Sequence, residues 1–357
     1  MTETSSDRRR RGNSDRSSGS STEPSAGGRT QVKIVIPDEY PMIGLLGSGD
    51  ELLHVIEDAF GADIHVRGNE ITVTGEPAEN TLITALFEQL IELLASGAEL
   101  SPDTIERSLG MLRRKSGVRP ADVLTVDILS ARGRTIRPKT LNQKRYVDAI
   151  DRHTIVFAIG PAGTGKTYLA MAKAVKALQD KEVNRIILTR PAVEAGERLG
   201  FLPGTLFEKI DPYLRPLYDA LHDMIDPDSI PRLTAAGTIE IAPLAYMRGR
   251  TLSDAFIILD EAQNTTPEQM KMFLTRLGFD SKIVVTGDIT QVDLPGDTRS
   301  GLNVVREILT GLEDVHFAYL GSSDVVRHRL VGNIVDAYER YERITPQKSG
   351  ERAKPRR

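Results

Sequence analysis

Beyond residue 141, short apolar runs alternate with longer stretches in which apolar residues recur at helical spacing. Each run is rich in Val, Ile and Ala, a composition typical of strands buried on both faces of a sheet. Because helical stretches separate most of the runs, the pattern predicts an α/β domain with a parallel sheet and helices on both faces. The predicted strands are residues 153–159, 185–190, 239–242, 255–259, 282–286 and 315–320.

Residues 31–115 follow a different pattern, which predicts a small α+β domain. The expected order is a strand, a short amphipathic helix, a hairpin and two helices. Gly68 lies at the predicted hairpin turn, and Pro102 takes the first helical position of the last helix. These elements cover residues 32–36, 50–60, 64–66, 70–74 and 79–96, with the last helix beginning near residue 101.

Three segments lack both periodicities. Residues 1–30 and 344–357 contain few apolar residues, so they cannot offset the entropy cost of ordering and are expected to be disordered tails. Their basic residues are expected to be solvated, with contact to RNA or a membrane as the alternative. Residues 116–140 hold Gly, Arg and Pro with little periodicity. They are predicted to be a basic linker that leads into the α/β domain, residues 141–343.

Charge changes this picture, because a small total hides large local imbalances. The chain of 357 residues has a net charge of −4. Residues 31–112 carry three basic and fifteen acidic residues, a net charge of −12, whereas residues 113–145 carry ten basic and two acidic residues, a net charge of +8. Such asymmetry indicates that different parts of the chain meet different partners.

Composition excludes several classes of protein. The chain has no Cys, which excludes a disulfide scaffold, a cysteine nucleophile and a thiolate-ligated zinc. No apolar run approaches the roughly 20 residues of a membrane-spanning helix, and residues 1–30 hold no hydrophobic segment of a secretory signal. We therefore expect a cytoplasmic protein with no membrane partner.

The strongest chemical signal is a glycine-rich loop that follows the first predicted strand of the α/β domain and opens a helix. Backbone N–H groups of such a loop surround phosphate oxygens, and the helix N-terminus adds a positive dipole. Lys166 can reach the β- and γ-phosphates, and the Thr167 hydroxyl can ligate Mg²⁺. The loop comprises Gly160, Pro161, Ala162, Gly163, Thr164, Gly165, Lys166 and Thr167.

Two adjacent acids end the apolar strand at residues 255–259. Asp260 is placed to hold Mg²⁺ through water, and Glu261 to orient or deprotonate an attacking water molecule. The alternative is an acidic strand end that faces solvent. A carboxylate in the Glu261 position favours hydrolysis over transfer to a bound hydroxyl, because a kinase does not need to activate water.

Three weaker signals surround this pair. Gln291 follows another buried strand and is a candidate sensor of the γ-phosphate or its water. Gln143 and Tyr146 precede the loop; they are candidates for hydrogen bonding to the adenine edge and for stacking near the base, with a surface helix start as the alternative. Arg327 could stabilise transition-state charge, with a salt bridge as the alternative.

Six motifs in order resemble the PhoH family, a group of cytoplasmic P-loop ATPases related to the ATP-binding half of superfamily-1 helicases. The resemblance implies a RecA-like sheet that uses ATP and Mg²⁺, adenine contacts for Gln143 and Tyr146, and a sensor role for Gln291. It also implies a nucleotide-sensing or finger role for Arg327 and a nucleic-acid-facing role for residues 189–191. The motifs are residues 140–146, 160–167, 188–197, 260–264, 286–291 and 324–328.

Long members of this family carry an N-terminal module that resembles a KH domain. Residues 44–47, Gly-Leu-Leu-Gly, stand where the nucleic-acid clamp of such a module would be. This loop is apolar and is followed by Asp50 and Glu51, and a net charge of −12 repels a phosphate backbone. We therefore expect the KH-like module to dock protein rather than RNA.

Oligomerisation is expected because a superfamily-1 motor closes ATP between two lobes. Only about 14 residues follow residue 343, which are too few for a second lobe. The missing arginine would then come from a neighbouring subunit. We expect a homo-oligomer, with a hexameric ring favoured, and Arg327, Arg248 or Arg250 near the subunit boundary.

The leading hypothesis is a Mg²⁺-dependent ATPase coupled to RNA metabolism. The resemblance implies cooperation with a YbeY-type endoribonuclease in RNA or ribosome maturation, and a link to phosphate supply. The alternative is a nucleotide-gated docking or assembly protein in which slow hydrolysis acts only as a timer. A small-molecule kinase is disfavoured by Glu261 and by the lack of an arginine-rich lid in residues 205–235.

Overall fold

The computed structural model of the chain describes residues 28–114, 117–191, 206–296, 298–326 and 337. Almost all of the predicted N-terminal tail and the whole of the predicted C-terminal tail lie outside these ranges. The same is true of Arg327 and of residues 192–197 in the third motif.

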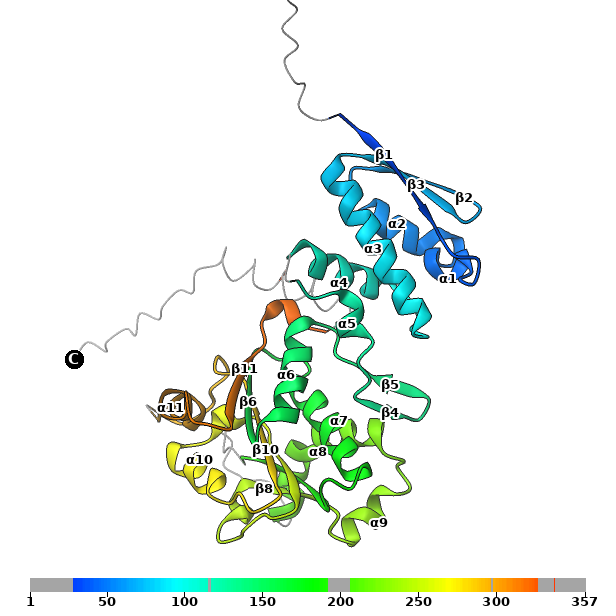
Figure 1. Ribbon diagram of the computed structural model, residues 1–357. Coiled ribbons are helices and arrows are strands. Elements are labelled where there is room, and N and C mark those ends of the chain that lie inside the picture. The colour runs from blue at the N-terminus through cyan, green and yellow to red at the C-terminus, as the bar shows by residue number, and fades with distance from the viewer. Residues whose placement is uncertain (1–27, 115–116, 192–205, 297, 327–336, 338–357) are drawn as a thin grey trace, which may run out of the picture.

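The described chain begins with a small α+β domain (Figure 1). An antiparallel sheet in the order β1-β3-β2 packs against helices through a core that includes Leu45, Ile71 and Phe87. The alternating burial of β3 matches the period of a strand with one buried face. All the elements predicted from the pattern are present: β1 (Thr30–Val35), α2 (Glu51–Glu57), β2 (Asp63–Arg67), β3 (Glu70–Gly75), α3 (Pro77–Ala95) and α4 (Pro102–Arg113). The structure adds α1 (Met42–Leu46) and η1 (Ser48–Asp50), which the pattern did not predict.

The expected clamp loop of this domain is the end of a helix. Leu45 and Leu46 are buried in the domain core, which explains why the segment is apolar. Gly47 stops α1 with a φ of 80°, and a Cβ there would lie 2.7 Å from the Glu51 side chain. The segment therefore contributes packing and a turn.

Residues 116–140 hold more regular structure than their composition predicts. They contain α5 (Pro120–Leu124) and a hairpin of β4 (Leu129–Ala131) and β5 (Arg134–Ile136). Ile128, Leu129 and Ile136 are buried in the core of the α/β domain. The second half of the predicted linker is thus packed against that domain, and Arg132 and Arg134 are exposed on the hairpin. Its first half, α5, contacts α3 and α4 of the small domain.

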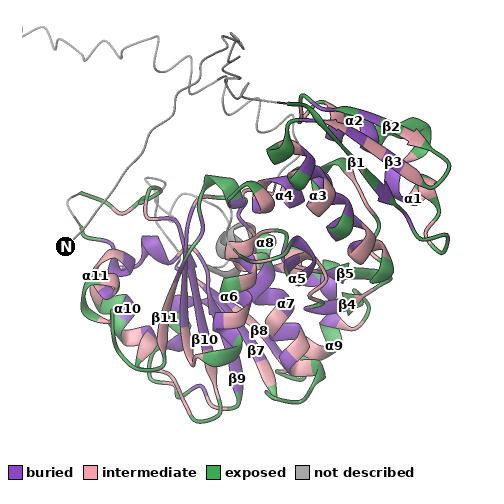
Figure 2. Ribbon diagram, turned by 45° about the horizontal axis from the view of Figure 1, so that its top comes forward, coloured by how far each residue is buried: buried purple, intermediate pink, exposed green. Residues whose placement is uncertain are grey.

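The α/β domain contains the predicted six-stranded parallel sheet, in the order β11-β6-β10-β9-β7-β8. Alternate residues of β6 enter two different cores: Val156 and Ala158 face α6, α7 and α8, whereas Phe157 and Ile159 face α10 and α11. Figure 2 shows the buried strands between these two helical layers. The strands are β6 (Ile155–Ile159), β7 (Arg185–Arg190), β8 (Ile239–Pro243), β9 (Ala255–Leu259), β10 (Lys282–Gly287) and β11 (Val315–Tyr319).

Two helices of this domain begin at capping residues and bury an apolar face. α10 begins with a capping box of Thr266 and Gln269. The N-cap of α6 is Thr140, whose hydroxyl accepts from the Gln143 N–H. The helices are α6 (Leu141–Arg152), α7 (Lys166–Gln179), α8 (Leu206–Met224), α9 (Ile230–Ala235), α10 (Pro267–Leu274) and α11 (Gly301–Ile308), with short turns η3 (Leu244–Met247), η4 (Ala262–Asn264) and η5 (Ser322–Asp324). None of the helices in the described part of the chain could cross a membrane.

Strand order decides where the polar side chains meet. β10 lies between β6, which leads into the glycine-rich loop, and β9, which leads into the two acids. Close backbone approach at this edge requires glycine at two strand ends: a Cβ on Gly160 would lie 2.3 Å from the Leu320 carbonyl, and one on Gly287 would lie 2.8 Å from the Gln263 amide oxygen.

Candidate nucleotide-binding site

A cavity of about 250 Å³ lies at the carboxyl edge of the parallel sheet. Parallel strands place their carboxyl ends at one edge, where open α/β sheets bind ligands. The cavity brings together residues from three distant parts of the sequence. It is lined by Ala162, Gly163, Gly165, Lys166, Thr167, Tyr168, Asp260, Glu261, Gly287, Asp288 and Gln291.

The glycine-rich loop wraps one side of this cavity. Gly163 and Gly165 have φ values of 81° and 80°, a conformation that side chains with a Cβ rarely adopt. α7 begins at Lys166, so the free N–H groups of its first turn lie beside the cavity. The Lys166 ammonium donates to the carbonyls of Gly160 at 2.6 Å and Pro161 at 2.9 Å.

A hydroxyl–carboxylate group forms the floor. The Thr167 hydroxyl donates to Asp260 Oδ1 at 2.6 Å, and the Thr286 hydroxyl donates to the same oxygen at 2.7 Å. Oxygen donors of these two kinds are the ligands that Mg²⁺ prefers, so the residues present fit this ion. Asp260 and Thr167 lie where the sequence predicts the metal site, and Thr286 joins them from β10.

Glu261 is held in place by two neighbours. Its backbone is in the left-handed region with a φ of 52°, a costly conformation for a residue with a side chain. Arg190 lies 3.3 Å from one carboxylate oxygen, and Gln263 donates to the other at 2.6 Å. Gln263 also accepts from the Asp288 N–H at 2.9 Å. The carboxylate is therefore oriented toward the cavity and linked to the loop after β10.

That loop supplies the last wall. Asp288 Oδ1 accepts from the N–H and the hydroxyl of Thr290, whereas its buried Oδ2 has no hydrogen-bond partner among the described residues. An unsatisfied oxygen beside the cavity is consistent with a site built for a ligand that donates or is cationic. Gln291 is exposed at the mouth, and its sensor role stays a prediction.

The structure corrects the expected stacking of Tyr146 on a base. The Tyr146 side chain is fully buried and its hydroxyl donates to the Lys166 carbonyl at 3.0 Å. Burial, and secondarily the charge of Asp260, raises the pKa of its phenol well above the ordinary value, so the group remains a donor. With no exposed ring face, Tyr146 supports the first turn of α7 from behind.

Gln143 is also nearly buried, at 2% exposure. Its amide oxygen accepts from the Lys139 N–H at 2.7 Å, and its amide nitrogen donates to the Thr164 carbonyl at 3.0 Å. Both ends of the amide are thus bonded within the protein, and its adenine contact stays a prediction. Gln143 therefore holds the loop in position.

The segment after β11 fastens the loop from the other side. Asp324 is 1% exposed, and its carboxylate accepts from the Thr140 hydroxyl at 2.6 Å and the Asn142 amide at 3.0 Å. Two residues on, the Val326 N–H donates to the Gly163 carbonyl at 2.9 Å. α6, the glycine-rich loop and η5 are thus tied together.

We expect Asp324→Ala to lower the free energy of unfolding by about 2–3 kcal/mol, because it removes a charged acceptor and leaves buried donors unpaired. Urea unfolding followed by circular dichroism measures the change. The control is Asp293→Ala, which removes an exposed carboxylate and should change stability by less than about 0.5 kcal/mol. Equal stability of the two variants would contradict this assignment.

Other predicted residues lie apart from the cavity. Arg250 pairs with both carboxylate oxygens of Glu240, at 2.6 and 2.7 Å, and this pairing lowers the pKa of Glu240. Arg248 is exposed beside it. Thr189 is fully buried and Arg190 binds Glu261, so the described part of the third motif contributes support to the site.

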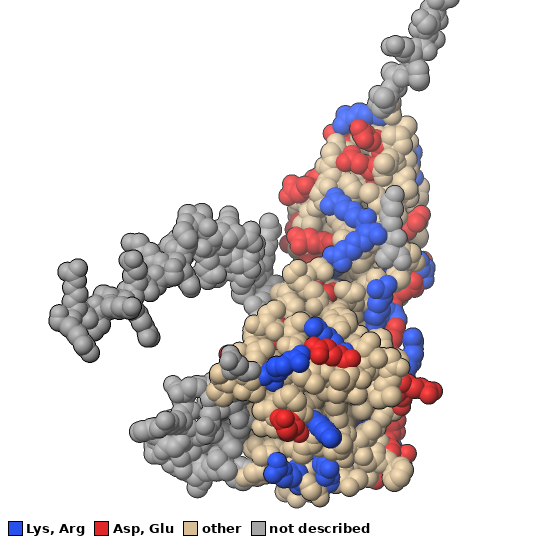
Figure 3. All heavy atoms as spheres, turned by 90° about the vertical axis from the view of Figure 1, so that its left-hand side faces the viewer, with Lys and Arg blue, Asp and Glu red and all other residues tan. Residues whose placement is uncertain are grey.

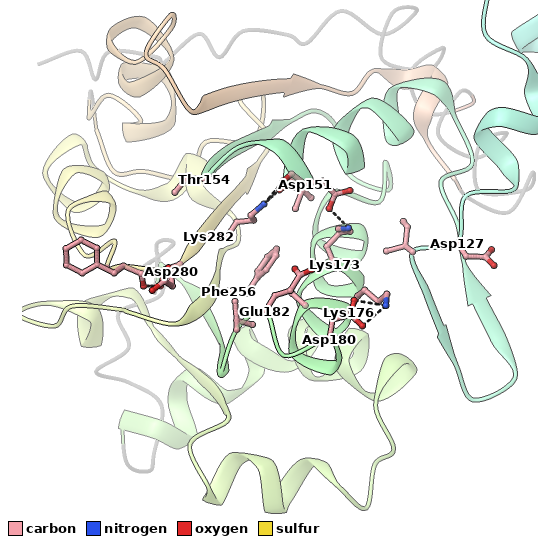
Figure 4. Close-up of a pocket in the computed structure, with 17 residues that line it drawn as sticks. Asp127, Asp151, Thr154, Lys173, Lys176, Asp180, Glu182, Phe256, Asp280 and Lys282 are labelled. Atoms are coloured by element: carbon pink, nitrogen blue, oxygen red, sulfur yellow. Dashed lines mark hydrogen bonds and ion pairs between the residues drawn. The ribbon is translucent and has the colours of Figure 1, made fainter.

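Another cavity, of about 610 Å³, lies at the opposite edge of the sheet (Figure 4). Its charged groups already neutralise one another: Lys173 pairs with Asp151, and Lys176 pairs with Asp180. The Lys282 ammonium donates to backbone carbonyls at the end of α6. The ammonium group of each lysine that lines this cavity is therefore already engaged within the protein.

The six-stranded parallel sheet, the glycine-rich loop opening a helix and the acids at the next strands define a P-loop NTPase with a nucleotide-binding site. The family profile described as PhoH-like protein matches residues 135–339. This chain belongs to the PhoH family.

The sequences of known relatives align with most of the chain. The PhoH-like protein of Mycobacterium tuberculosis (strain H37Rv) is 67% identical over 89% of this chain and 90% of its own. The PhoH-like protein of Bacillus subtilis (strain 168) is 50% identical over 86% and 96%. Among solved structures, the Pif1 helicase from Candida albicans aligns over 56% of this chain and 43% of its own, with 16% identity and a TM-score of 0.32.

Proposed function

We propose that this protein is a Mg²⁺-dependent ATPase. The observation that carries the proposal is the convergence of Lys166, the Thr167–Asp260 pair and the oriented Glu261 on one cavity. This set provides phosphate binding, a metal site and a base for water, which together are the requirements of nucleotide hydrolysis.

Each residue then has a separate task. Thr167 and Asp260 would hold Mg²⁺, which when bound neutralises charge on the phosphates. The loop N–H groups and Lys166 bind the phosphate oxygens. Glu261 accepts a proton from the attacking water, and Arg190 and Gln263 keep its carboxylate aimed into the cavity.

Coupling to RNA is supported by a groove of about 460 Å³ between α4 and α6. Its lining includes an ion pair of Arg107 with Asp103 and the acid Glu106. Arg114, Lys139 and Arg145 also line it, and no ion pair of these three is found within the described ranges. Unpaired cations along one groove are suited to phosphates of a nucleic acid backbone. In this proposal the protein is cytoplasmic and linked to phosphate supply, and a YbeY-type endoribonuclease acts on the same RNA.

A homo-oligomer completes the proposal. A hexameric ring would bring an arginine of a neighbouring subunit to the nucleotide. Arg250 is bonded to Glu240 within its own subunit. Of the two arginines Arg248 and Arg250, the exposed Arg248 is therefore the better candidate for reaching the nucleotide of a neighbouring subunit. Light scattering of the protein during ATP turnover tests this assembly, and full activity as a monomer would exclude it.

An ATPase assay with and without single-stranded RNA tests the coupling. We expect RNA to raise turnover several-fold, and the double variant Arg114→Ala/Arg145→Ala to lose the stimulation while keeping basal turnover. The matched control, Lys271→Ala/Arg232→Ala, removes two exposed cations elsewhere and should respond to RNA as the wild type does. Equal stimulation in both double variants would exclude the groove.

The acidic small domain favours a second candidate function, nucleotide-gated docking of a protein. Acidic side chains cover part of the face of this domain shown in Figure 3, interleaved with basic ones, and its net charge over residues 31–112 is −12. Slow turnover without any RNA response, together with partner binding that differs between ATP and ADP, would favour this function.

A further inference from the structure

A second cavity, of about 480 Å³, adjoins the phosphate cavity and has no role in the proposed chemistry. The two cavities share Gly163, Gly165 and Tyr168, so they lie against the same stretch of the glycine-rich loop. A nucleoside triphosphate bound through its phosphates at the loop therefore has space for its base and ribose on this side.

The walls of the second cavity are suited to a flat aromatic group. Ile136 and Leu169 are buried apolar residues, at 9% and 3% exposure, and Val326 is half-buried. Tyr168 is 37% exposed, so its ring is accessible where that of Tyr146 is not. Pockets for nucleotide bases combine such apolar walls with an aromatic face on which the base stacks.

Polar groups lie at the rim. Arg134 and Lys139 are exposed at the cavity, and Arg137 is held by an ion pair with Asp127. Burial, followed by the charge of Asp223, raises the pKa of the Tyr168 phenol, partly opposed by Arg134. The hydroxyl therefore remains protonated at neutral pH and is available as a hydrogen-bond donor.

We infer that Tyr168 and the β4–β5 hairpin form the pocket for the base of the nucleotide, with Ile136 and Val326 as its apolar walls. This inference rests on the proposed function, because it places the other half of the same ligand. Gln143 itself lines this cavity. It is a positioning residue in this arrangement, because its amide holds the Lys139 backbone at the pocket and the Thr164 carbonyl in the glycine-rich loop. The segment predicted to be a linker thus becomes part of the nucleotide site.

The test separates base recognition from phosphate recognition. Isothermal titration calorimetry of the full chain with Mg²⁺ compares ATP with inorganic tripolyphosphate, which has no base. We expect Tyr168→Ala to weaken ATP binding about tenfold, the loss of one stacking contact, and to leave tripolyphosphate binding unchanged. Tyr168→Phe keeps the ring and should bind ATP within about twofold of the wild type.

Tyr246→Ala is the matched control, because Tyr246 is similarly exposed, at 41%, and lies outside both cavities. Unchanged ATP affinity in Tyr168→Ala would overturn the inference, as would an equal loss for ATP and tripolyphosphate, which indicates a distorted loop. Failure of the wild-type protein to bind ATP would instead overturn the proposed function. The two failures are therefore distinguishable.

Discussion

Glu261→Gln is expected to bind ATP almost as tightly as the wild type and to hydrolyse it at least about a hundredfold more slowly. Loss of a general base typically costs 10²- to 10⁴-fold, while the amide keeps the size of the carboxylate. Its oxygen can still accept from Gln263, which lies 2.6 Å from the carboxylate in the wild type. Binding through the loop and Lys166 is unaffected by the change.

Single-turnover hydrolysis and calorimetry on the same preparation measure the two effects. Glu268→Gln is the control: it makes the same chemical change at an exposed position of α10, and its turnover should equal that of the wild type. Arg190→Ala should give an intermediate rate, because it leaves the base but removes one group that orients it. Normal turnover in Glu261→Gln would remove Glu261 from its role.

The parallel sheet could be predicted because each of its strands is buried on both faces. In β6 both Val156 and Phe157 are fully buried, although they face different cores. A strand of this kind appears in the sequence as a continuous apolar run. Its neighbours in space do not appear in the sequence, so the position of β10 between β6 and β9 became known only from the structure.

The hairpin at residues 129–136 shows why the sequence predicted a linker where the structure has regular elements. Its two strands have three residues each, which is too short for a visible period. Leu129 and Ile136 pair with each other in register and are its buried residues, while the residues between them are small, polar or basic. Contact with a distant helix, α7, orders this segment, and such contacts are not encoded locally.

Within the site, the sequence contained one signal that the prediction of base stacking overlooked. Gln143, Tyr146, Val147 and Ile150 follow the spacing of a buried helix face, and all four are buried. That stripe predicts that Tyr146 faces the protein core. Thr286 and Gln263 carried weaker signals, because a threonine ending a strand and an amide after two acids acquire roles only through neighbours in space.

Lys166→Ala is expected to weaken ATP binding at least about a hundredfold, roughly 3 kcal/mol. Lys166 is the cationic side chain that lines the described phosphate cavity, and phosphate oxygens left without it lose a charged partner in a partly buried site. Because its ammonium also bonds two loop carbonyls, a second variant, Lys166→Met, keeps the length of the stem and should lose binding equally.

Lys173→Ala is the matched control for this loss. Lys173 lies on the same helix, but it pairs with Asp151 at the opposite edge of the sheet, so its removal should leave ATP affinity within about twofold. Lys166→Ala should lose tripolyphosphate as well as ATP, whereas Tyr168→Ala should lose only ATP. Loss of both ligands in Lys166→Ala and of ATP alone in Tyr168→Ala would assign phosphate binding to Lys166 and base binding to Tyr168. If Lys166→Ala and Lys173→Ala had the same affinity for ATP, the assignment of the nucleotide site would be wrong.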